Sequence, residues 1–357
     1  MAYLNRLLLK GNEAVVYGAL LAGCDAFYGY PITPASEVAH SSAKLFPMLH
    51  RTFLQAESEI SAINMVIGAS AAGKRVMTGS SGLGISLKQE AVSYLAAFEL
   101  PAVIVDVMRG GPGLGNISPE QSDYFQVVKG GGHGAYRCLV FTPDSVQEMC
   151  DCGYNAFAMC EKYRTPAYIL ADGVIGQMME SVTLPEPTDY VFDPEWAVNK
   201  YNDKGEANYL TTIYLENDEL ERRNNLLQEK FRRIQENEQS AEEYMTDDAE
   251  LVFVAYGISA RIARTAVHEL RNEGYKVGLL RPKMVFPFPE RALNKLVNAE
   301  TVKNFLCVEL SPGQMIEDVK LSIECRRPVH LAYRMGGNIP SVREICEKAV
   351  AILKGAC

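Results

Sequence analysis

The first half of the chain alternates between segments whose apolar residues recur at helical spacing and short segments that are almost wholly apolar. The first kind predicts helices, and the second predicts buried strands. Helices are predicted at 11–23, 57–73, 84–100 and 144–163, and strands at 26–30, 75–81, 101–109, 138–143 and 166–172. Strands that alternate with helices in this way predict an α/β fold, in which a parallel sheet has helices on both faces.

The pattern changes between residues 185 and 248, where charged residues, Asn and Tyr become frequent. Residues 217–244 within this linker are predicted to form one exposed amphipathic helix. Its apolar face consists of Leu220, Leu227, Phe231 and Ile234. Such a helix is most often a connector that packs on a neighbouring element, and the alternative is a binding surface for a partner protein.

A second, smaller α/β unit is predicted after the linker. Its first strand, 249–257, precedes a helix at 259–274, for which Ser259 is the candidate N-cap and Gly274 marks the end. Further strands are expected at 275–289, 304–310 and 328–335. We therefore divide the chain into a domain over 1–184, a charged linker over 185–248 and a domain over 249–357.

Composition and charge narrow the classes of protein to consider. The net charge of −9 argues against a general nucleic-acid binder. No apolar run approaches the roughly 20 residues that span a bilayer, and the first residues lack the apolar core and cleavage site of a signal peptide. We therefore expect a cytoplasmic protein that binds neither nucleic acid nor a membrane.

The nine cysteines are scattered as single residues, apart from the C-x-C pair Cys150 and Cys152, and no C-x-x-C occurs. This usage is typical of a reducing compartment. Zinc and iron–sulfur sites commonly use C-x-x-C pairs. We therefore expect no metal site in this chain, and we interpret most of the thiols as small buried side chains.

Three loops rich in glycine or proline follow predicted strands: YPITP (30–34), TGSSGLG (78–84) and RGGPGLGN (109–116). Pro31 and Pro34 end the first strand and hold Thr33 in a stiff loop. Glycines allow a backbone to approach a ligand closely, and ligands of open parallel sheets bind beyond the carboxyl ends of the strands. The three loops therefore predict a binding site, and the alternative is three ordinary turns.

The segment GASAAGKR (68–75) nearly matches the phosphate-binding loop G-x-x-x-x-G-K-[ST]. Arg75 stands where that motif needs a hydroxyl group for magnesium. The segment also leads from a helix into a strand, whereas the true loop leads from a strand into a helix. We therefore exclude a nucleotide-triphosphate site and interpret the small residues as close packing of a helix that ends at Gly73.

Two carboxylates, Glu57 and Glu59, lie at the start of the second predicted helix. A favourable interaction with the helix dipole is a sufficient explanation for Glu57. Glu59 precedes a largely apolar stretch, and a carboxylate in such surroundings is suited to proton chemistry.

Read together, these segments resemble the alpha subunit of the 2-oxoacid:ferredoxin oxidoreductases. The resemblance rests on residues 11–38, 55–84 and 108–126 and continues through LLRPKMVFPFP and VELSPGQM in the second unit. It implies a thiamine-diphosphate-binding fold, with a pyrimidine-type domain followed by a domain like the transketolase C-terminal domain. GGGHGAYR (130–137) is most similar to the branch that acts on 2-oxoisovalerate (3-methyl-2-oxobutanoate), and 2-oxoglutarate is the alternative substrate.

The resemblance also implies roles for particular residues. Glu59 would hydrogen-bond the aminopyrimidine ring of thiamine diphosphate and promote the imino tautomer, which removes the thiazolium C2 proton. Arg109 would bind the substrate carboxylate, for which the paired donors of a guanidinium are suited. The remaining cofactor contacts would be Pro31, Ile32, Thr33, Gly82 and Gly84. Substrate contacts would include Thr33, Gly110 and His133.

The family further implies partners. A beta subunit would hold the diphosphate and Mg²⁺, and a gamma subunit and a ferredoxin-like subunit would complete the enzyme, with the iron–sulfur clusters outside this chain. The reaction would be the oxidative decarboxylation of a 2-oxoacid in anaerobic metabolism, with coenzyme A as acyl acceptor and ferredoxin as electron acceptor. An alpha–alpha contact is also possible.

Two other functions were weighed. The first is a non-catalytic structural or electron-transfer subunit of the same fold, against which stands the joint presence of Thr33, Glu59 and Arg109. The second is a self-sufficient thiamine enzyme, but the chain has no G-D-G followed by an asparagine at the usual distance, which is the signature of the diphosphate and magnesium site.

Overall fold

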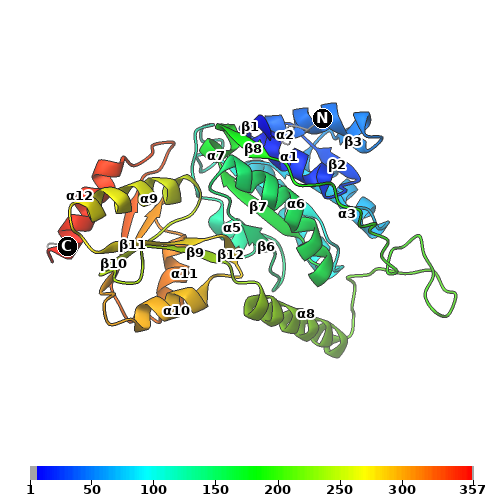
Figure 1. Ribbon diagram of the computed structural model, residues 1–357. Helices are drawn as coiled ribbons and strands as arrows, with labels where there is room; N and C mark the ends of the chain where they lie inside the picture. The colour runs from blue at the N-terminus through cyan, green and yellow to red at the C-terminus, as the bar shows by residue number, and fades with distance from the viewer. Residues whose placement is uncertain (1–5, 356–357) are drawn as a thin grey trace.

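A seven-stranded sheet forms the centre of the first unit in the computed structural model, which describes residues 6–355 (Figure 1). The strand order is β12-β6-β7-β5-β4-β2-β3. All neighbouring strands are parallel except β12, which runs antiparallel to β6. The predicted parallel sheet is thereby confirmed. Its strands are β2 (Ala26–Gly29), β3 (Thr52–Gln55), β4 (Val76–Ser80), β5 (Val103–Met108), β6 (Leu139–Phe141), β7 (Ala167–Asp172) and β12 (Met284–Phe286).

Seven helices of the described chain belong to this unit, and the four predicted ones are among them. Gly23 and Gly73 follow α1 and α3 with positive φ angles of 85° and 78°, as expected of residues that end helices. The helices are α1 (Gly11–Leu21), α2 (Ser36–Met48), α3 (Glu59–Ala71), α4 (Leu83–Ala97), α5 (Tyr124–Val128), α6 (Val146–Tyr163) and α7 (Gly173–Gln177).

Helices α1 and α6 cross at very short range. A Cβ atom at Gly18 would overlap the carbonyl group of Cys150, and one at Gly153 would overlap that of Val15. Cys150 is fully buried, and Cys152 is partly buried and packs against the core. The C-x-C pair therefore belongs to a helix–helix contact.

Several elements were not predicted from the sequence. Strand β1 (Arg6–Lys10) pairs antiparallel with β8 (Met179–Thr183) in a separate two-stranded sheet. Strand β3 and helices α2, α5 and α7 are the other omissions in this unit. Strands of four or five residues carry too few positions for a period of two to stand out from the surrounding sequence.

The second unit contains a five-stranded sheet of order β14-β13-β10-β11-β9. Its strands are parallel except β9, which runs antiparallel to β11. The strands are β9 (Ala241–Tyr244), β10 (Leu251–Val254), β11 (Val277–Pro282), β13 (Asn304–Glu309) and β14 (Val329–Tyr333), and the helices are α9 (Gly257–Asn272), α10 (Glu290–Asn298), α11 (Met315–Ser322) and α12 (Val342–Leu353).

The amphipathic helix of the linker is shorter than predicted. Helix α8 spans Asn217–Asn237, and the last four residues of the predicted helix form β9 instead. Hydrogen bonds from the edge of β11 determine the conformation of this segment, so tertiary pairing overrides the helical pattern. Phe231 and Ile234 are buried, whereas Leu220 is 42% exposed. The ring of Phe231 packs on that of Phe286 in β12, so α8 leans on its neighbours.

The predicted strand at 275–289 is divided between the two sheets. β11 lies in the second sheet, and β12 crosses over to pair with β6 of the first sheet. The two units also share a continuous core, in which residues such as Val105 and Phe305 belong to one buried cluster.

Asp172, at the end of β7, joins the two units through its carboxylate. It caps α7 by accepting hydrogen bonds from Val174 N and Ile175 N, and it also accepts one from Ile258 N at the start of α9 (2.7 Å). Ser259 is therefore not the N-cap that the sequence suggested. Its buried hydroxyl donates to Gln121 Oε1 (3.0 Å) across the same junction.

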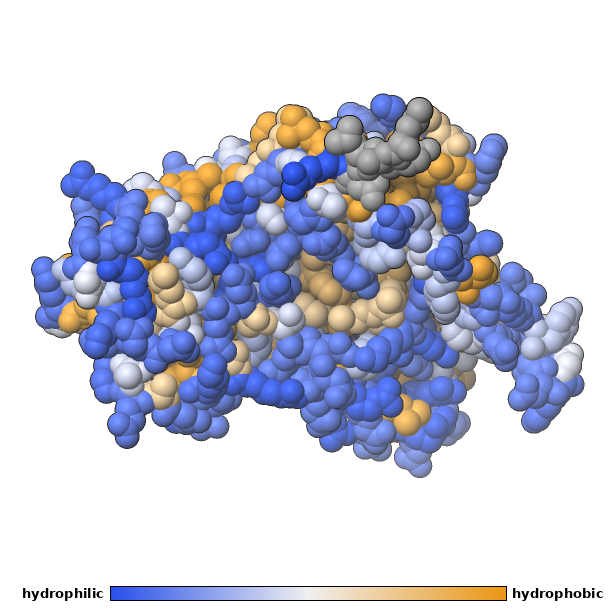
Figure 2. Space-filling model, in the orientation of Figure 1, coloured by the Kyte–Doolittle hydropathy of each residue, from blue (hydrophilic) through white to orange (hydrophobic). Residues whose placement is uncertain are grey.

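Hydrophilic residues cover most of the face of the molecule drawn in Figure 2, and apolar residues gather there in small groups. Within residues 6–355, no helix combines the length and apolar character that crossing a bilayer requires.

Candidate active site

Four neighbouring strands of the first sheet bring the predicted site residues to one edge. The strands β5, β4, β2 and β3 lie side by side in that order and are parallel, so their carboxyl ends coincide. Arg109 follows β5, Gly82 follows β4, Thr33 follows β2, and Glu59 follows β3. The expected grouping of the three loops is therefore present.

The proline loop after β2 is held by hydrogen bonds from two other elements. Asn12 Nδ2 on α1 and Gln177 Nε2 on α7 both donate to the carbonyl oxygen of Pro34, at 2.7 and 2.9 Å. Thr33 is exposed, whereas Pro31 and Ile32 are partly buried. The chain thus presents the Thr33 side chain outward on a fixed loop.

Arg109 links the loops. Its guanidinium donates to the carbonyl oxygen of Thr33 (Nη1, 2.9 Å) and to that of Leu114 (Nη2, 3.0 Å). Its aliphatic stem lies over Gly82, where a Cβ atom would be 3.5 Å from Arg109 Cγ. In this structure Arg109 therefore braces the proline loop and the glycine loop against each other.

The two neighbouring carboxylates have opposite environments. Glu57 precedes the N-cap Ser58, is exposed, and accepts a hydrogen bond from Ser61 Oγ (2.6 Å), which lowers its pKa. Glu59 is the first residue of α3 and is 6% exposed. Only Glu59 points into the protein.

Small residues surround the Glu59 carboxylate. A Cβ atom at Gly84, in the first turn of α4, would lie 2.7 Å from Glu59 Oε1 and would also overlap Ser80 Oγ. The hydroxyl oxygens of Ser80 and Ser81 are buried, and neither has a hydrogen-bond partner among the described residues. Polar atoms without partners at the end of β4 are unusual in a finished interior and are typical of a ligand site.

A cleft of about 520 Å³ lies beside these loops. Gly82, Arg109 and Gly110 line it from the first unit, as the sequence predicted for a binding site. The sequence did not point to Ser86, Glu120, Ser122 and Asp123, nor to Pro312, Gln314 and Met335 of the second unit. The motif VELSPGQM contains two of the second-unit residues, Pro312 and Gln314, and could have indicated that the second unit contributes to the cleft.

Glu120 connects the two walls of the cleft. Its carboxylate accepts a hydrogen bond from Gly111 N (2.8 Å) in the glycine loop and another from Gly336 N (3.0 Å) in the second unit. Asn116 adds a hydrogen bond from its side chain to Gly336 O (3.1 Å). The second unit therefore helps to hold the glycine loop in place.

Two buried carboxylates, Asp123 before α5 and Asp106 in β5, lie next to each other, and Asp123 is one of the residues that line the cleft. Both oxygens of Asp106 and one of Asp123 are buried and have no donor among the described residues. Burial and the negative charge of Asp123 raise the pKa of Asp106 well above its usual range. Burial also raises the pKa of Asp123 to about 6. The pair therefore favours a state in which one carboxyl carries a proton.

His133 does not join the other predicted residues. It is exposed on the loop that precedes β6, which is not one of the loops after β2, β3, β4 and β5. Like Thr33 and Glu59, it is not among the residues that line the cleft. Neighbouring Gly132 packs closely against the backbone of Gln89 on α4, and Gly132 N donates to Tyr136 Oη (2.9 Å).

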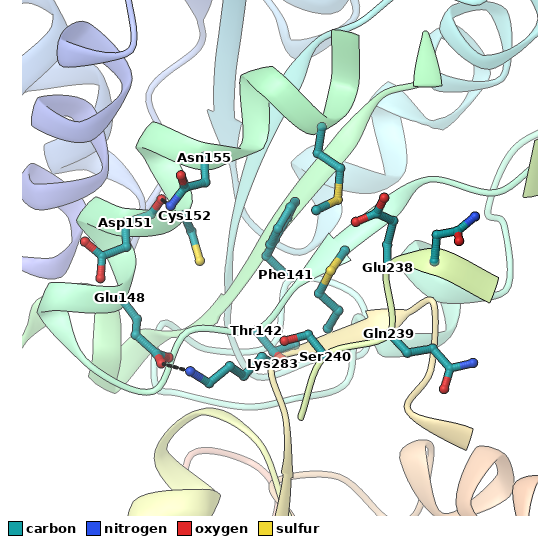
Figure 3. Close-up of a pocket in the computed structure, with 13 residues that line it drawn as sticks. Phe141, Thr142, Glu148, Asp151, Cys152, Asn155, Glu238, Gln239, Ser240 and Lys283 are labelled. Carbon is teal, nitrogen blue, oxygen red and sulfur yellow. Dashed lines mark hydrogen bonds and ion pairs between the residues drawn. The ribbon is translucent and has the colours of Figure 1, made fainter. Parts of the chain in front are cut away.

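A separate cavity of about 420 Å³ lies between α6, the end of α8 and β12 (Figure 3). Glu148, Asp151 and Glu238 contribute carboxylates to it, and Glu148 pairs with Lys283. None of the predicted site residues lines this cavity.

Comparison with known proteins places the chain in a family. Residues 17–247 match the family described as pyruvate flavodoxin/ferredoxin oxidoreductase, thiamine diphosphate-binding. Residues 249–345 match core domain II of pyruvate:ferredoxin oxidoreductase.

Two relatives illustrate the range of similarity. The ketoisovalerate oxidoreductase subunit VorB of Methanothermobacter thermautotrophicus is 56% identical over 342 residues, which cover 96% of each chain. The 2-oxoglutarate synthase subunit KorA of Archaeoglobus fulgidus is 37% identical over 89% of this chain and 92% of its own.

A similar solved structure is the 2-oxoglutarate:ferredoxin oxidoreductase of Magnetococcus marinus, with a TM-score of 0.81 and 26% identity. The match covers 97% of this chain and 65% of that one. A split-gene transketolase shares the fold, with a TM-score of 0.59 and 14% identity. The chain therefore belongs to the thiamine diphosphate-binding pyruvate flavodoxin/ferredoxin oxidoreductase family and is a subunit of a 2-oxoacid oxidoreductase.

Proposed function

We propose that this chain is the alpha subunit of an enzyme that oxidatively decarboxylates ketoisovalerate to an acyl-coenzyme A and passes the electrons to ferredoxin. Higher identity to the VorB subunit than to the KorA subunit supports the branched-chain substrate. The observation that carries the catalytic assignment is Glu59, a buried carboxylate at a helix N-terminus beside the loops of Thr33 and Arg109.

The residues at the edge of the sheet fit the aminopyrimidine half of thiamine diphosphate. When bound, this cofactor supplies an acidic thiazolium carbon and an electron sink. Glu59 would share a hydrogen bond with a ring nitrogen of the cofactor. Its carboxylate is directed inward, and the missing side chain of Gly84 leaves space beside its oxygens. The unpartnered hydroxyls of Ser80 and Ser81 would supply further hydrogen bonds.

Thr33 and Arg109 would orient the substrate. A guanidinium has five N–H donors, and the hydrogen bonds described for Arg109 engage only Nη1 and Nη2, with Thr33 and Leu114. Donors therefore remain for a substrate carboxylate. Bracing and binding are compatible roles, because the same guanidinium fixes the loop that carries Thr33. Gly110 and the exposed His133 remain proposed substrate contacts.

A beta subunit would complete the cofactor site with the diphosphate and Mg²⁺ contacts, and gamma and ferredoxin-like subunits would carry the iron–sulfur clusters. Exposed apolar side chains around the same edge of the sheet support a subunit interface there. They are Leu54, Ile60, Leu87, Leu114 and Ile117, which are 40–77% exposed. The eight described cysteines are free thiols, which suits work in a reducing cytoplasm.

The assembled enzyme should use ketoisovalerate with a higher kcat/KM than 2-oxoglutarate. The test is a steady-state comparison of both substrates with coenzyme A and an oxidised ferredoxin, on the complex purified through a tag on this chain. A preference for 2-oxoglutarate would overturn the substrate. If the complex reconstituted without this chain keeps its other subunits and its activity, the catalytic assignment is overturned.

A further inference from the structure

A buried lysine lies next to the proposed catalytic carboxylate. Lys88 on α4 is fully buried, with an exposed fraction of 0%. The other charged residue of this stretch, Glu90, is exposed and accepts a hydrogen bond from Tyr94 Oη (3.1 Å). A fully buried lysine is rare unless it is paired, and the functions proposed above give Lys88 no role.

The side chain of Lys88 approaches the start of α3. Its Nζ donates to the carbonyl oxygen of Glu59 (3.3 Å), which is its one hydrogen bond among the described residues. Residues 84 and 88 lie one turn apart on the same face of α4, and Gly84 is the residue whose missing side chain leaves room for the Glu59 carboxylate. Lys88 thus lies beside Glu59, one turn of α4 after the gap at Gly84.

The charge of Lys88 depends on that of Glu59. Burial lowers the pKa of Lys88 to about 8, and the Glu59 carboxylate opposes this effect. Glu59 is the charged group that acts on Lys88, because the neighbouring Ser80 on β4 is neutral. The N-terminus of α3 carries a positive partial charge that disfavours an ammonium group there. The Lys88 ammonium therefore relies on the negative charge of Glu59.

We propose that Lys88 is a positioning residue for the reaction, whose buried ammonium group holds the Glu59 carboxylate in place. This inference rests on the proposed function of Glu59. An ionised carboxylate is the form that accepts a hydrogen bond from a protonated ring nitrogen. The competing role is a purely structural one, in which Lys88 only anchors the backbone carbonyl of α3.

The first experiment measures exchange of the thiazolium C2 proton into deuterated buffer by NMR, in the reconstituted complex with thiamine diphosphate and Mg²⁺. At pH 7 the Lys88→Met complex should exchange about tenfold more slowly than the wild type, the low end of the loss expected when a residue that orients a functional side chain is removed. Above pH 8 the wild-type lysine becomes neutral, so the ratio of the two rates should approach one by about pH 9. A ratio that does not change with pH would overturn the proposal.

The second experiment measures thermal stability of the complex purified without thiamine diphosphate, between pH 7 and 10. Because the folded-state pKa of Lys88 lies below its unfolded value, the wild type should gain stability relative to Lys88→Met as the pH rises from about 8. With Glu59→Gln the lysine loses its counter-charge, so this gain should begin at a lower pH. If the gain in stability begins at the same pH in Glu59→Gln as in the wild type, Lys88 only anchors the backbone of α3, and the proposal is overturned.

Lys230 provides the matched control. It is a buried lysine on α8 that pairs with Glu99 Oε2 (2.9 Å) and donates to Arg164 O (3.0 Å), away from the cleft. Lys230→Met should lower stability and leave the pH profile of C2 exchange unchanged. If Lys88→Met does not assemble, Lys88→Gln retains a donor for the Glu59 carbonyl and should show the same pH dependence.

The two proposals fail in different ways. If the Glu59→Gln complex exchanges the C2 proton at the wild-type rate, the catalytic role of Glu59 is overturned, and the inference about Lys88 with it. Slow exchange in Glu59→Gln together with a pH-independent effect of Lys88→Met would overturn the role of Lys88 alone.

Discussion

The carboxyl edges of the two sheets differ in how their buried carboxylates are satisfied. In the second unit, Glu309 at the end of β13 accepts hydrogen bonds from the backbone of Gln314, Met315 and Ile316, each at 3.0 Å, and so organises the start of α11. In the first unit, three oxygens of the Asp106–Asp123 pair and the hydroxyls after β4 have no partner among the described residues. The two sheets have a similar arrangement of strands and helices. The buried polar groups at the carboxyl edge of the second sheet, which we call the closed edge, are hydrogen-bonded, whereas several at the edge of the first sheet are not.

This difference shows where a ligand is expected. Buried polar groups are almost always hydrogen-bonded, so a cluster of exceptions beside a cleft needs an external partner or a proton. Departures from the usual rules of packing and hydrogen bonding are more frequent at functional sites than elsewhere in a protein. The three predictions below test whether the first edge is a site and the second a structural joint.

The largest effect is expected from Glu59→Ala. If Glu59 holds the proton of the cofactor ring, the assembled enzyme should lose activity by about 10²–10⁴-fold, the usual contribution of general acid–base catalysis. Stability should also fall, by about 1–2 kcal/mol for the charge at the helix N-terminus and further because the buried Lys88 loses its counter-charge, but the complex should still assemble. The measurements are turnover of ketoisovalerate and thermal unfolding of the same preparation.

Glu57→Ala is the control for this variant. Glu57 is two residues earlier, but its carboxylate faces solvent and binds Ser61. Its removal should leave turnover close to that of the wild type. Equal losses in the two variants would mean that neither carboxylate has a specific role.

Arg109→Lys should have the next largest effect. Lysine keeps the charge but cannot reach two carbonyl groups and a carboxylate with one planar group. A loss of roughly 1–3 kcal/mol in kcat/KM is expected for hydrogen bonds to a charged group, with a larger change in KM for the 2-oxoacid than in the affinity for thiamine diphosphate. A variant that loses stability and turnover while its KM stays constant would limit Arg109 to bracing Thr33 and Leu114.

The smallest effect at neutral pH is expected from Asp106→Asn. An amide can replace a protonated carboxyl beside Asp123, so stability at pH 7 should change by less than about 1 kcal/mol. The folded-state pKa of Asp123, about 6, is above its unfolded value, so its contribution to wild-type stability is complete below about pH 4 and is lost as the pH rises through 6. Asp106, whose pKa is also raised, adds a loss of the same sign, and Asp106→Asn should remove this part, which thermal unfolding between pH 4 and 8 measures.

Glu309→Gln makes the same kind of change at the closed edge. Its carboxylate accepts four hydrogen bonds, one from Ser311 Oγ (2.9 Å) and three from the backbone. Replacing it should cost about 1–3 kcal/mol of stability at pH 7. If Asp106→Asn is as costly as Glu309→Gln, the two edges do not differ in the way described here.

The α/β architecture was predictable because long helices and wholly apolar strands have distinct periods. The helix ends at Gly23 and Gly73 followed from residue type alone. The strand β9 and the exchange of β12 between sheets were not predictable, because their pairing partners lie far away in the sequence and carry the decisive hydrogen bonds. The cap of α9 was missed for a related reason, since Asp172 comes from another unit.

The candidate site was predictable in part. Loops after strands, together with the family resemblance, pointed to Thr33, Glu59 and Arg109, and the parallel sheet brings their elements together. Lys88 and the Asp106–Asp123 pair were not predictable, because burial of a charged residue depends on packing that a helical or strand pattern does not reveal. The sequence also could not place His133, whose loop approaches α4 and not the cleft.

Strand β12 affects the order in which this protein can be completed during synthesis. It pairs with β6 at the edge of the first sheet, although 142 residues (142–283) separate the two strands in the chain. Until the ribosome has released residue 286, β6 has an open edge that can pair with other chains. A gene divided at the apparent boundary near residue 248 would therefore produce a first half with an unprotected strand, and its aggregation would depend on supplying the second half in time.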